Sequence, residues 1–207
     1  MPMKKSKLAI ILSNLEGFRE PKAELEQYPF DGQSASEFLW RAYELGDIEG
    51  KTIGDFGCGT GILGIGALLL GARFVYFIDK SEAAVHTAKR NAKMVEEEVG
   101  ESFKDRVVFL VGDVGKFNHE VNTVLQNPPF GTIKEHADRA FLEKAMEKGR
   151  IIYSVHKTST LKFLENFAEK HGRKITHVFK MEMQLKQTMK WHKADIRRIE
   201  VSGIRMV

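Results

Sequence analysis

The chain has 207 residues, 43% of them hydrophobic and 29% charged, a balance that is ordinary for a soluble globular protein. This length suits one domain that buries most of its apolar surface, and a single cysteine, Cys58, excludes an internal disulfide. The apolar stretch at 8–12 is too short for a secretory signal, and no apolar run approaches the roughly 20 residues that cross a bilayer. We therefore expect a cytoplasmic protein with no membrane partner.

In chain order, the hydrophobic pattern alternates between strands and helices. We expect helices at 33–45, 62–70, 82–99, 138–147 and 159–171. We expect strands at 52–56, 74–78, 107–111, 122–126, 151–154, 175–185 and 196–207. No helix fits between the last two strands, which are expected to be antiparallel neighbours. The pattern predicts an α/β fold with a mostly parallel sheet covered on both faces, whose ligands bind at the carboxyl ends of the strands.

The glycine-rich turn DFGCGTG, from Asp55 to Gly61, follows the first expected strand and opens a helix. It is not the dinucleotide fingerprint G-x-G-x-x-G, and a P-loop is excluded because position 45 is leucine and the segment precedes a strand. A merely tight turn is the alternative, but three glycines cost backbone entropy that such a turn would not need. Asp55 would repel a phosphate and suits a cationic ligand such as an aminoacyl sulfonium.

Two further carboxylates follow the next two strands. Asp79 lies 18 residues beyond Gly61, close to the spacing at which a carboxylate reaches ribose hydroxyls. Asp113 could accept a hydrogen bond from an adenine amine, although either residue alone could simply end a strand. Together the three carboxylates describe a ligand that is cationic at one end and a ribose-adenine at the other, which indicates S-adenosylmethionine.

The stretch LQNPPFGT, residues 125–132, follows the fourth strand. A proline turn without a ligand is one interpretation. The other is a site for a flat, amine-bearing group, because the Asn127 side chain and the Pro128 carbonyl could accept hydrogen bonds from an exocyclic amine. Pro129 lacks an N–H and fixes the local backbone, and Phe130 offers a face for a base to stack on.

The segments EQYPF, DFGCGTGIL, NPPFGT and SVHKTST, in this order, resemble the small class I methyltransferases that methylate N6 of an adenine in small-subunit ribosomal RNA. The resemblance implies one Rossmann-like domain over 1–207, with a seven-stranded sheet ending in an antiparallel hairpin. Within it, a helical segment at 1–50 would close over the cofactor, and 51–207 would form the core. Because NPPF also occurs in enzymes that methylate DNA or protein glutamine, a protein glutamine methyltransferase stays open, as does a silent cofactor-binding RNA scaffold.

The resemblance also implies site residues. Cofactor contacts would come from Gln27, Tyr28, Asp55, Gly57, Cys58, Gly59, Gly61, Leu63, Asp79, Asp113, Val114 and Asn127. The catalytic strip would be Asn127, Pro128, Pro129 and Phe130. RNA contacts would come from Phe130, His156, Lys157, Lys190 and Lys193.

Four more points concern the site, the partners and the surface. Phe30 stands where the family often has threonine, which puts a direct contact from that position in doubt. A small zinc-binding activator protein is a candidate partner, because the eukaryotic relative works with one. Most of the seven histidines are expected at the surface, and none has the spacing of a metal site. The net charge of +4, with basic clusters at both ends of the chain, suits RNA but also an ordinary solvated surface.

Overall fold

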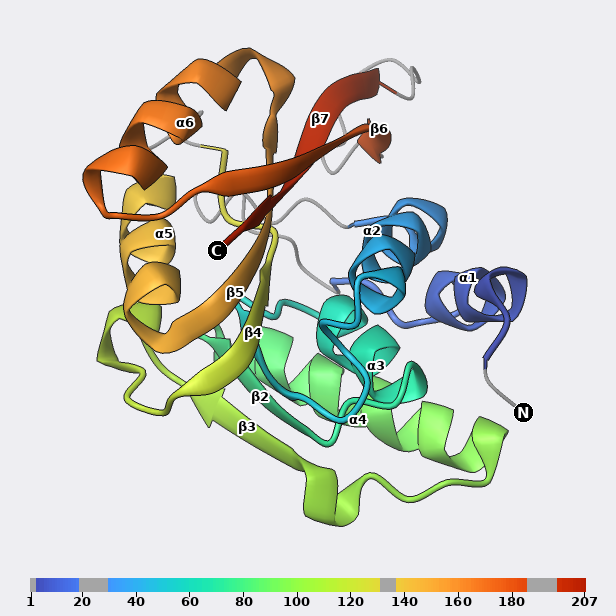
Figure 1. Ribbon diagram of the computed structural model, residues 1–207. Helices are drawn as coiled ribbons and strands as arrows, with labels where there is room; N and C mark the ends of the chain where they lie inside the picture. The colour runs from blue at the N-terminus through green and yellow to red at the C-terminus, as the bar shows by residue number, and fades with distance from the viewer. Residues whose placement is uncertain (1–2, 19–29, 131–136, 186–196) are drawn as a thin grey trace, which may run out of the picture.

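The structure is a computed structural model that describes residues 3–18, 30–130, 137–185 and 197–207 (Figure 1). Its sheet has seven strands in the order β3-β2-β1-β4-β5-β7-β6. The strands are β1 (Thr52–Phe56), β2 (Phe74–Asp79), β3 (Val107–Val111), β4 (Val121–Gln126), β5 (Gly149–Lys157), β6 (Ile175–Leu185) and β7 (Arg197–Met206). The α-helices are α1 (Lys5–Ser13), α2 (Gly32–Glu44), α3 (Ile62–Leu69), α4 (Glu82–Val99), α5 (Ala137–Lys148) and α6 (Leu161–Lys170).

The first five strands are parallel, and β7 runs antiparallel to both β5 and β6. This confirms the predicted mostly parallel sheet with an antiparallel C-terminal hairpin. Because β1 pairs with β2 on one side and β4 on the other, the strand order reverses at β1. The carboxyl ends of β1 and β4, where Phe56 is opposite Gln126, are therefore the switch point at which such sheets bind ligands.

β5 is longer than the pattern predicted, because the antiparallel partner β7 continues to pair with it. The register runs on to Val155 opposite Gly203, His156 opposite Ser202 and Lys157 opposite Val201. The expected helix at 159–171 begins one 3-10 turn later, since Thr158–Thr160 forms that turn before α6 starts. As a result, His156 lies within the sheet.

Two apolar cores lie on the two faces of the sheet. One contains buried residues from α1 to α4, among them Leu12, Phe38 and Val85, packed on sheet residues such as Phe77. The other joins α5 and α6 to the opposite face through residues such as Leu142 and Leu164. Figure 1 shows the same arrangement, with α5 and α6 on one side of the sheet and the other four helices on the other side.

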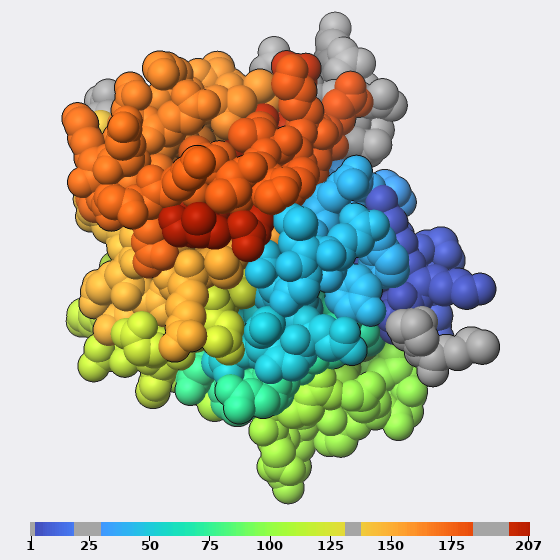
Figure 2. Space-filling view, in the orientation of Figure 1, coloured from blue at the N-terminus to red at the C-terminus, as the bar shows by residue number. Residues whose placement is uncertain are grey.

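Helix α2 and the C-terminal strands lie against each other, as Figure 2 shows. A buried cluster ties these parts together: Asp47, just after α2, accepts hydrogen bonds from the Tyr153 hydroxyl at 2.7 Å and from Arg205 Nε at 2.8 Å. The Thr123 hydroxyl also donates to the Asp47 carbonyl at 2.6 Å. Within the described part of the chain, no helix is long and apolar enough to cross a membrane.

Candidate active site

The glycine turn after β1 is held by the carboxylate at the end of β2. The Gly59 N–H donates to Asp79 Oδ2 at 2.9 Å, and the Ser81 N–H donates to Oδ1 at 2.8 Å. Burial raises the pKa of Asp79 above its ordinary value of 3.8, although these backbone donors oppose the rise. Asp79, at the carboxyl end of β2, therefore fixes the shape of the glycine turn.

Gly57 and Gly59 are two of the positions in the turn that require glycine. Gly57 and Gly59 have φ of 67° and 53°, in the left-handed region that other residues avoid. A Cβ on Gly57 would lie 2.8 Å from the Phe141 ring, and one on Gly59 would lie 2.9 Å from the Phe18 ring. The left-handed backbone conformation and the close approach of the aromatic rings therefore both explain why positions 57 and 59 are glycine.

Asp55 is buried, at 1% exposure, at the end of β1. Its Oδ2 accepts the N–H of Gly64 in the first turn of α3 at 2.8 Å. Burial raises the pKa of Asp55 to about 7, and the neighbouring Asp79 charge adds to the rise. A cationic ligand beside this carboxyl would favour its charged form.

The other expected residues of the turn region lie around it. Burial, followed by the charges of Asp55 and Asp79, raises the pKa of the Cys58 thiol well above its ordinary value, so this side chain is a small neutral lining group. After β3, exposed Asp113 accepts the Gly115 N–H at 2.7 Å. Val114 beside it is buried, as is Leu63 in α3, and Gly61 caps the start of α3 with a left-handed φ of 88°.

The strip that follows β4 carries an unsatisfied acceptor. The Asn127 Oδ1 atom is buried and has no hydrogen-bond partner among the described residues. Pro128 is buried, whereas Pro129 and Phe130 are half-buried, with Phe130 packed against the core on the α1–α4 side. A buried amide oxygen without a partner is costly, and such atoms in folded proteins call for an explanation.

One RNA-contacting residue suggested by the sequence needs correction. His156 is only 2% exposed, and burial lowers its pKa to about 3. It is therefore neutral at physiological pH and does not present a cation to a phosphate. The other histidines among the described residues, His86, His119, His171 and His177, are exposed, in line with the expectation that most histidines lie at the surface. Lys157 is half-buried at the end of β5. Gln27, Tyr28, Lys190 and Lys193 lie outside the described residues.

Phe30, which replaces the family threonine, is 6% exposed and packs on Phe38 with ring centroids 6.0 Å apart. The substitution thus places an aromatic ring in the core on the α1–α4 side. Phenylalanine has no hydroxyl, so this side chain cannot make the hydrogen bond that a threonine here could make to a ligand.

Sequence reasoning missed a residue that connects the N-terminal segment to the turn. The buried Asn91 side chain in α4 donates to the carbonyls of Glu16 and Thr60, both at 2.9 Å, and accepts the Glu16 N–H at 2.8 Å. The sequence did contain a signal for Asn91. Asparagine is a poor helix former, and here it lies on the apolar side of a helix, between Ala88 and Val95, which indicates that its side chain makes specific hydrogen bonds. Asn91 thereby holds the segment that leads to Phe18 against the turn.

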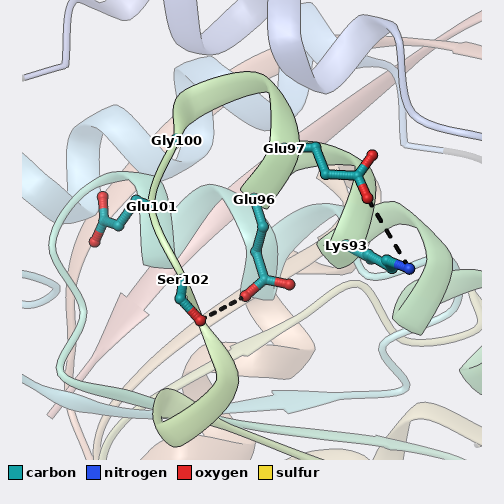
Figure 3. Close-up of a pocket in the computed structure, with 6 residues that line it drawn as sticks. All are labelled: Lys93, Glu96, Glu97, Gly100, Glu101 and Ser102. Atoms are coloured by element: carbon teal, nitrogen blue, oxygen red, sulfur yellow. Dashed lines mark hydrogen bonds and ion pairs between the residues drawn. The ribbon is translucent and has the colours of Figure 1, made fainter.

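A surface hollow at the C-terminal end of α4 is separate from the glycine turn and the NPPF strip (Figure 3). It is lined by Lys93, Glu96, Glu97, Gly100, Glu101 and Ser102. Glu96 accepts the Ser102 hydroxyl at 3.2 Å and also caps the Phe103 N–H. The hollow lies between the C-terminal end of α4 and the segment that leads to β3, and none of its lining residues belongs to the glycine turn. Within the described ranges, no group of three or more histidine, cysteine, aspartate or glutamate residues could hold a metal ion.

The strand order, the glycine turn and the acidic residues at successive strand ends define an S-adenosylmethionine-dependent methyltransferase. The family model of ribosomal protein L11 methyltransferase (PrmA) matches residues 40–155. The magnesium protoporphyrin IX methyltransferase of Synechocystis, crystallised with S-adenosylmethionine, shares the fold, with a TM-score of 0.63 and 16% identity over 84% of this chain and 77% of that one.

Relatives that match along their full length show which family of methyltransferases the chain belongs to. The Drosophila melanogaster rRNA N(6)-adenosine-methyltransferase Mettl5 is 36% identical over 96% of this chain and 94% of its own length. A crystal structure of the Pyrococcus horikoshii protein PH1948 matches with a TM-score of 0.88 and 42% identity, covering 98% of this chain and 96% of that one. The chain belongs to the METTL5-type family of rRNA N6-adenosine methyltransferases.

Proposed function

We propose that this protein transfers a methyl group to N6 of an adenine in small-subunit ribosomal RNA. The carrying observation is the buried Asn127 Oδ1, which has no hydrogen-bond partner among the described residues. It stands at the carboxyl end of β4, at the switch point of the sheet, where a substrate amine would meet the cofactor. Three full-length relatives, from Drosophila melanogaster, Danio rerio and Caenorhabditis elegans, are rRNA N(6)-adenosine-methyltransferases, which supports RNA adenine as the target.

S-adenosylmethionine supplies an electrophilic methyl group on a sulfonium. The turn residues Gly57, Cys58, Gly59 and Gly61 would hold its methionine part, and Asp55 lies where a buried carboxylate suits positive charge. Asp79 would accept the ribose hydroxyls, and Asp113 with Val114 would contact the adenine. The left-handed glycines and the partly satisfied carboxylates at the strand ends fit these groups.

The adenine amine is a weak nucleophile because its lone pair is delocalised into the ring. Hydrogen bonds accepted by Asn127 Oδ1 and by the Pro128 carbonyl would draw the nitrogen toward tetrahedral geometry and stabilise the positive charge that develops on it. No base needs to remove a proton before attack. Pro129 has no N–H, so it cannot compete for these acceptors, and its ring restrains Pro128.

The target base must leave its stack to reach this pocket. Phe130 offers it a ring on which to stack, which is worth roughly 1–3 kcal/mol in comparable base–aromatic contacts. Lys157 at the end of β5, with Lys190 and Lys193, would contact phosphates. The closing of the 1–50 segment over the cofactor, the single-domain organisation and a zinc-binding activator stay predictions.

A protein amide is the second candidate substrate. A glutamine side chain presents the same NH2 group to the strip, and a family model named for a ribosomal-protein methyltransferase matches residues 40–155. The two candidates differ in salt dependence, because binding through phosphate contacts weakens steeply as salt rises, whereas binding to a neutral peptide does not.

The test is transfer of labelled methyl to unmethylated small-subunit RNA, followed by nucleoside analysis, with Asn127→Ala beside the wild type. Asn118→Ala is a matched control, because Asn118 is exposed and bonds only to Lys148 in the described structure. We expect N6-methyladenosine in the wild type and in the control, and none in Asn127→Ala. Label on a protein glutamine would favour the second candidate, and a bound cofactor without transfer would indicate a silent scaffold.

A further inference from the structure

A buried chain of polar side chains lies directly behind the catalytic strip. Gln126 Nε2 donates to Ser154 Oγ at 3.0 Å, and Ser154 Oγ lies 2.7 Å from His156 Nε2. On the other side of the ring, His156 Nδ1 lies 3.7 Å from Asp138 Oδ2. Gln126 and Ser154 have no exposed surface, and the Asp138 side chain is 17% exposed.

The hydrogen-bonding chemistry of these groups determines which atoms of Ser154 and His156 carry a hydrogen. Ser154 Oγ accepts from the Gln126 amide, so its own hydrogen is available to His156 Nε2. A neutral imidazole that accepts at Nε2 carries its hydrogen on Nδ1, which then faces the Asp138 carboxylate. The opposite tautomer would turn a lone pair toward that carboxylate, which is electrostatically unfavourable.

The position of these four residues along the chain is informative. Gln126 is the last residue of β4 and directly precedes Asn127. Asp138 lies in the first turn of α5, the next helix after the strip. Ser154 and His156 belong to β5, which is fixed between β4 and β7 in the sheet. Two contacts of hydrogen-bond length thus join Gln126, on one side of the NPPF segment, to β5, and Asp138, on the other side, approaches His156 at 3.7 Å.

We propose that Gln126, Ser154, His156 and Asp138 form a positioning clamp that holds the Asn127 amide oxygen in the orientation required for methyl transfer. This proposal rests on the proposed function. None of the four residues needs to touch the substrate, so they are positioning residues. Burying polar side chains costs desolvation free energy, so a buried polar network needs a structural or functional explanation. Here the network lies next to Asn127, whose Oδ1 has no partner among the described residues and must keep its orientation. A displacement of about 1 Å at a reacting group can lower a rate roughly 100-fold.

The experiment uses Ser154→Ala, which removes one hydroxyl and leaves the rest of the side chain. Its matched control is Ser202→Ala, because Ser202 is also fully buried, lies in the neighbouring strand β7 and bonds to Thr158 Oγ1 at 3.0 Å instead of to the clamp. The first readout is amide hydrogen exchange of the peptides that contain Asn127, Phe130 and the first turn of α5. The second is the kcat for methyl transfer, with the Kd for S-adenosylmethionine measured separately.

We expect Ser154→Ala to speed exchange in those peptides at least fivefold, with β1 and β2 unchanged, and to lower kcat 10- to 100-fold at nearly constant Kd. Ser202→Ala should do neither. Unchanged exchange in Ser154→Ala would overturn the clamp, whatever the kinetics show. Faster exchange in a protein that transfers no methyl to RNA adenine would refute the proposed function and leave the clamp standing. If Ser154→Ala does not fold, Asp138→Asn, at the half-buried end of the clamp, must show the same two effects.

Discussion

The N–H of Gly59 donates to the Asp79 carboxylate over 2.9 Å, so the end of β2 sets the shape of the glycine turn after β1. Asp79 would thus act on the cofactor in two ways. It would contact the ribose, as we propose, and it keeps the turn in the left-handed conformation that brings the backbone close to the ligand. The second role is visible in the structure without any ligand.

This double role predicts that Asp79→Ala weakens S-adenosylmethionine binding at least 30-fold, because a ribose contact and the turn geometry are lost together. RNA affinity should change less than threefold, since Asp79 lies at the cofactor side of the site. Calorimetry with the cofactor and a filter-binding assay with the RNA measure the two quantities. Asp105→Ala, at an exposed aspartate before β3, is the control that should change neither. Equal losses of both affinities would show that the ribose assignment is wrong.

Asn91 offers a second prediction, on the link between the N-terminal segment and the turn. Asn91→Ala removes three hydrogen bonds and leaves the Thr60 carbonyl without this donor. We expect the free energy of unfolding to fall by about 2–3 kcal/mol, because a net hydrogen bond contributes about 1 kcal/mol and a buried unpaired group costs more. Cofactor affinity should fall as well. Urea denaturation and calorimetry measure the two effects, and a variant as stable as the wild type would contradict the role of Asn91.

The sequence was enough to predict the sheet, because strand and helix periodicities alternate clearly from Thr52 to Lys170. Residues that act at strand ends, such as Asp55 and Asp79, could be found because they follow strands directly. The environment of His156 could not be found this way. Its burial depends on the pairing of β5 with β7, more than 40 residues later in the chain, and no local pattern encodes that contact. Asn91 was missed for a similar reason, because its partners are 75 and 31 residues away.

The buried cluster around Asp47 gives a third prediction, on stability. Asp47→Ala leaves the Arg205 guanidinium without its carboxylate, although the Arg205 side chain is only 16% exposed. We expect a loss of about 3–5 kcal/mol in the free energy of unfolding, as is typical when one partner of a buried ion pair is removed. Tyr153→Phe, which removes one hydrogen bond from the same carboxylate, should cost about 1 kcal/mol.

The control for this cluster is a surface ion pair. Arg41 and Glu44 lie 3.7 Å apart on α2 with half-exposed side chains, so Glu44→Ala should cost less than about 0.5 kcal/mol. Urea denaturation of all three variants at one pH provides the comparison. Similar losses for Asp47→Ala and Glu44→Ala would mean that the buried pair adds little beyond an ordinary surface contact.

Asp55 gives the last prediction, on the pH dependence of stability in the absence of cofactor. Burial raises the pKa of Asp55 from 3.8 to about 7 in the folded protein. Between these pH values the folded state keeps its proton while the unfolded state has lost it, so the folded state binds more protons. The contribution of Asp55 to the free energy of unfolding is therefore largest below pH 4 and is lost as the pH rises through 7. His156 acts in the opposite sense, because its lowered pKa of about 3 makes the protein lose stability as the pH falls below 6.5.

Comparison of the wild type with Asp55→Asn isolates the aspartate, because the His156 contribution is common to both proteins and cancels in the difference. The stability of the wild type relative to the variant should decrease by up to roughly 2.5 kcal/mol between pH 5 and pH 7, since one unit of pKa shift corresponds to about 1.4 kcal/mol. Urea denaturation at pH 5, 6, 7 and 8 measures this difference. Two parallel curves would show that Asp55 ionises in the folded protein as it does in the unfolded chain. A buried carboxyl that resists ionisation in this way would be available to respond to a cationic ligand at neutral pH.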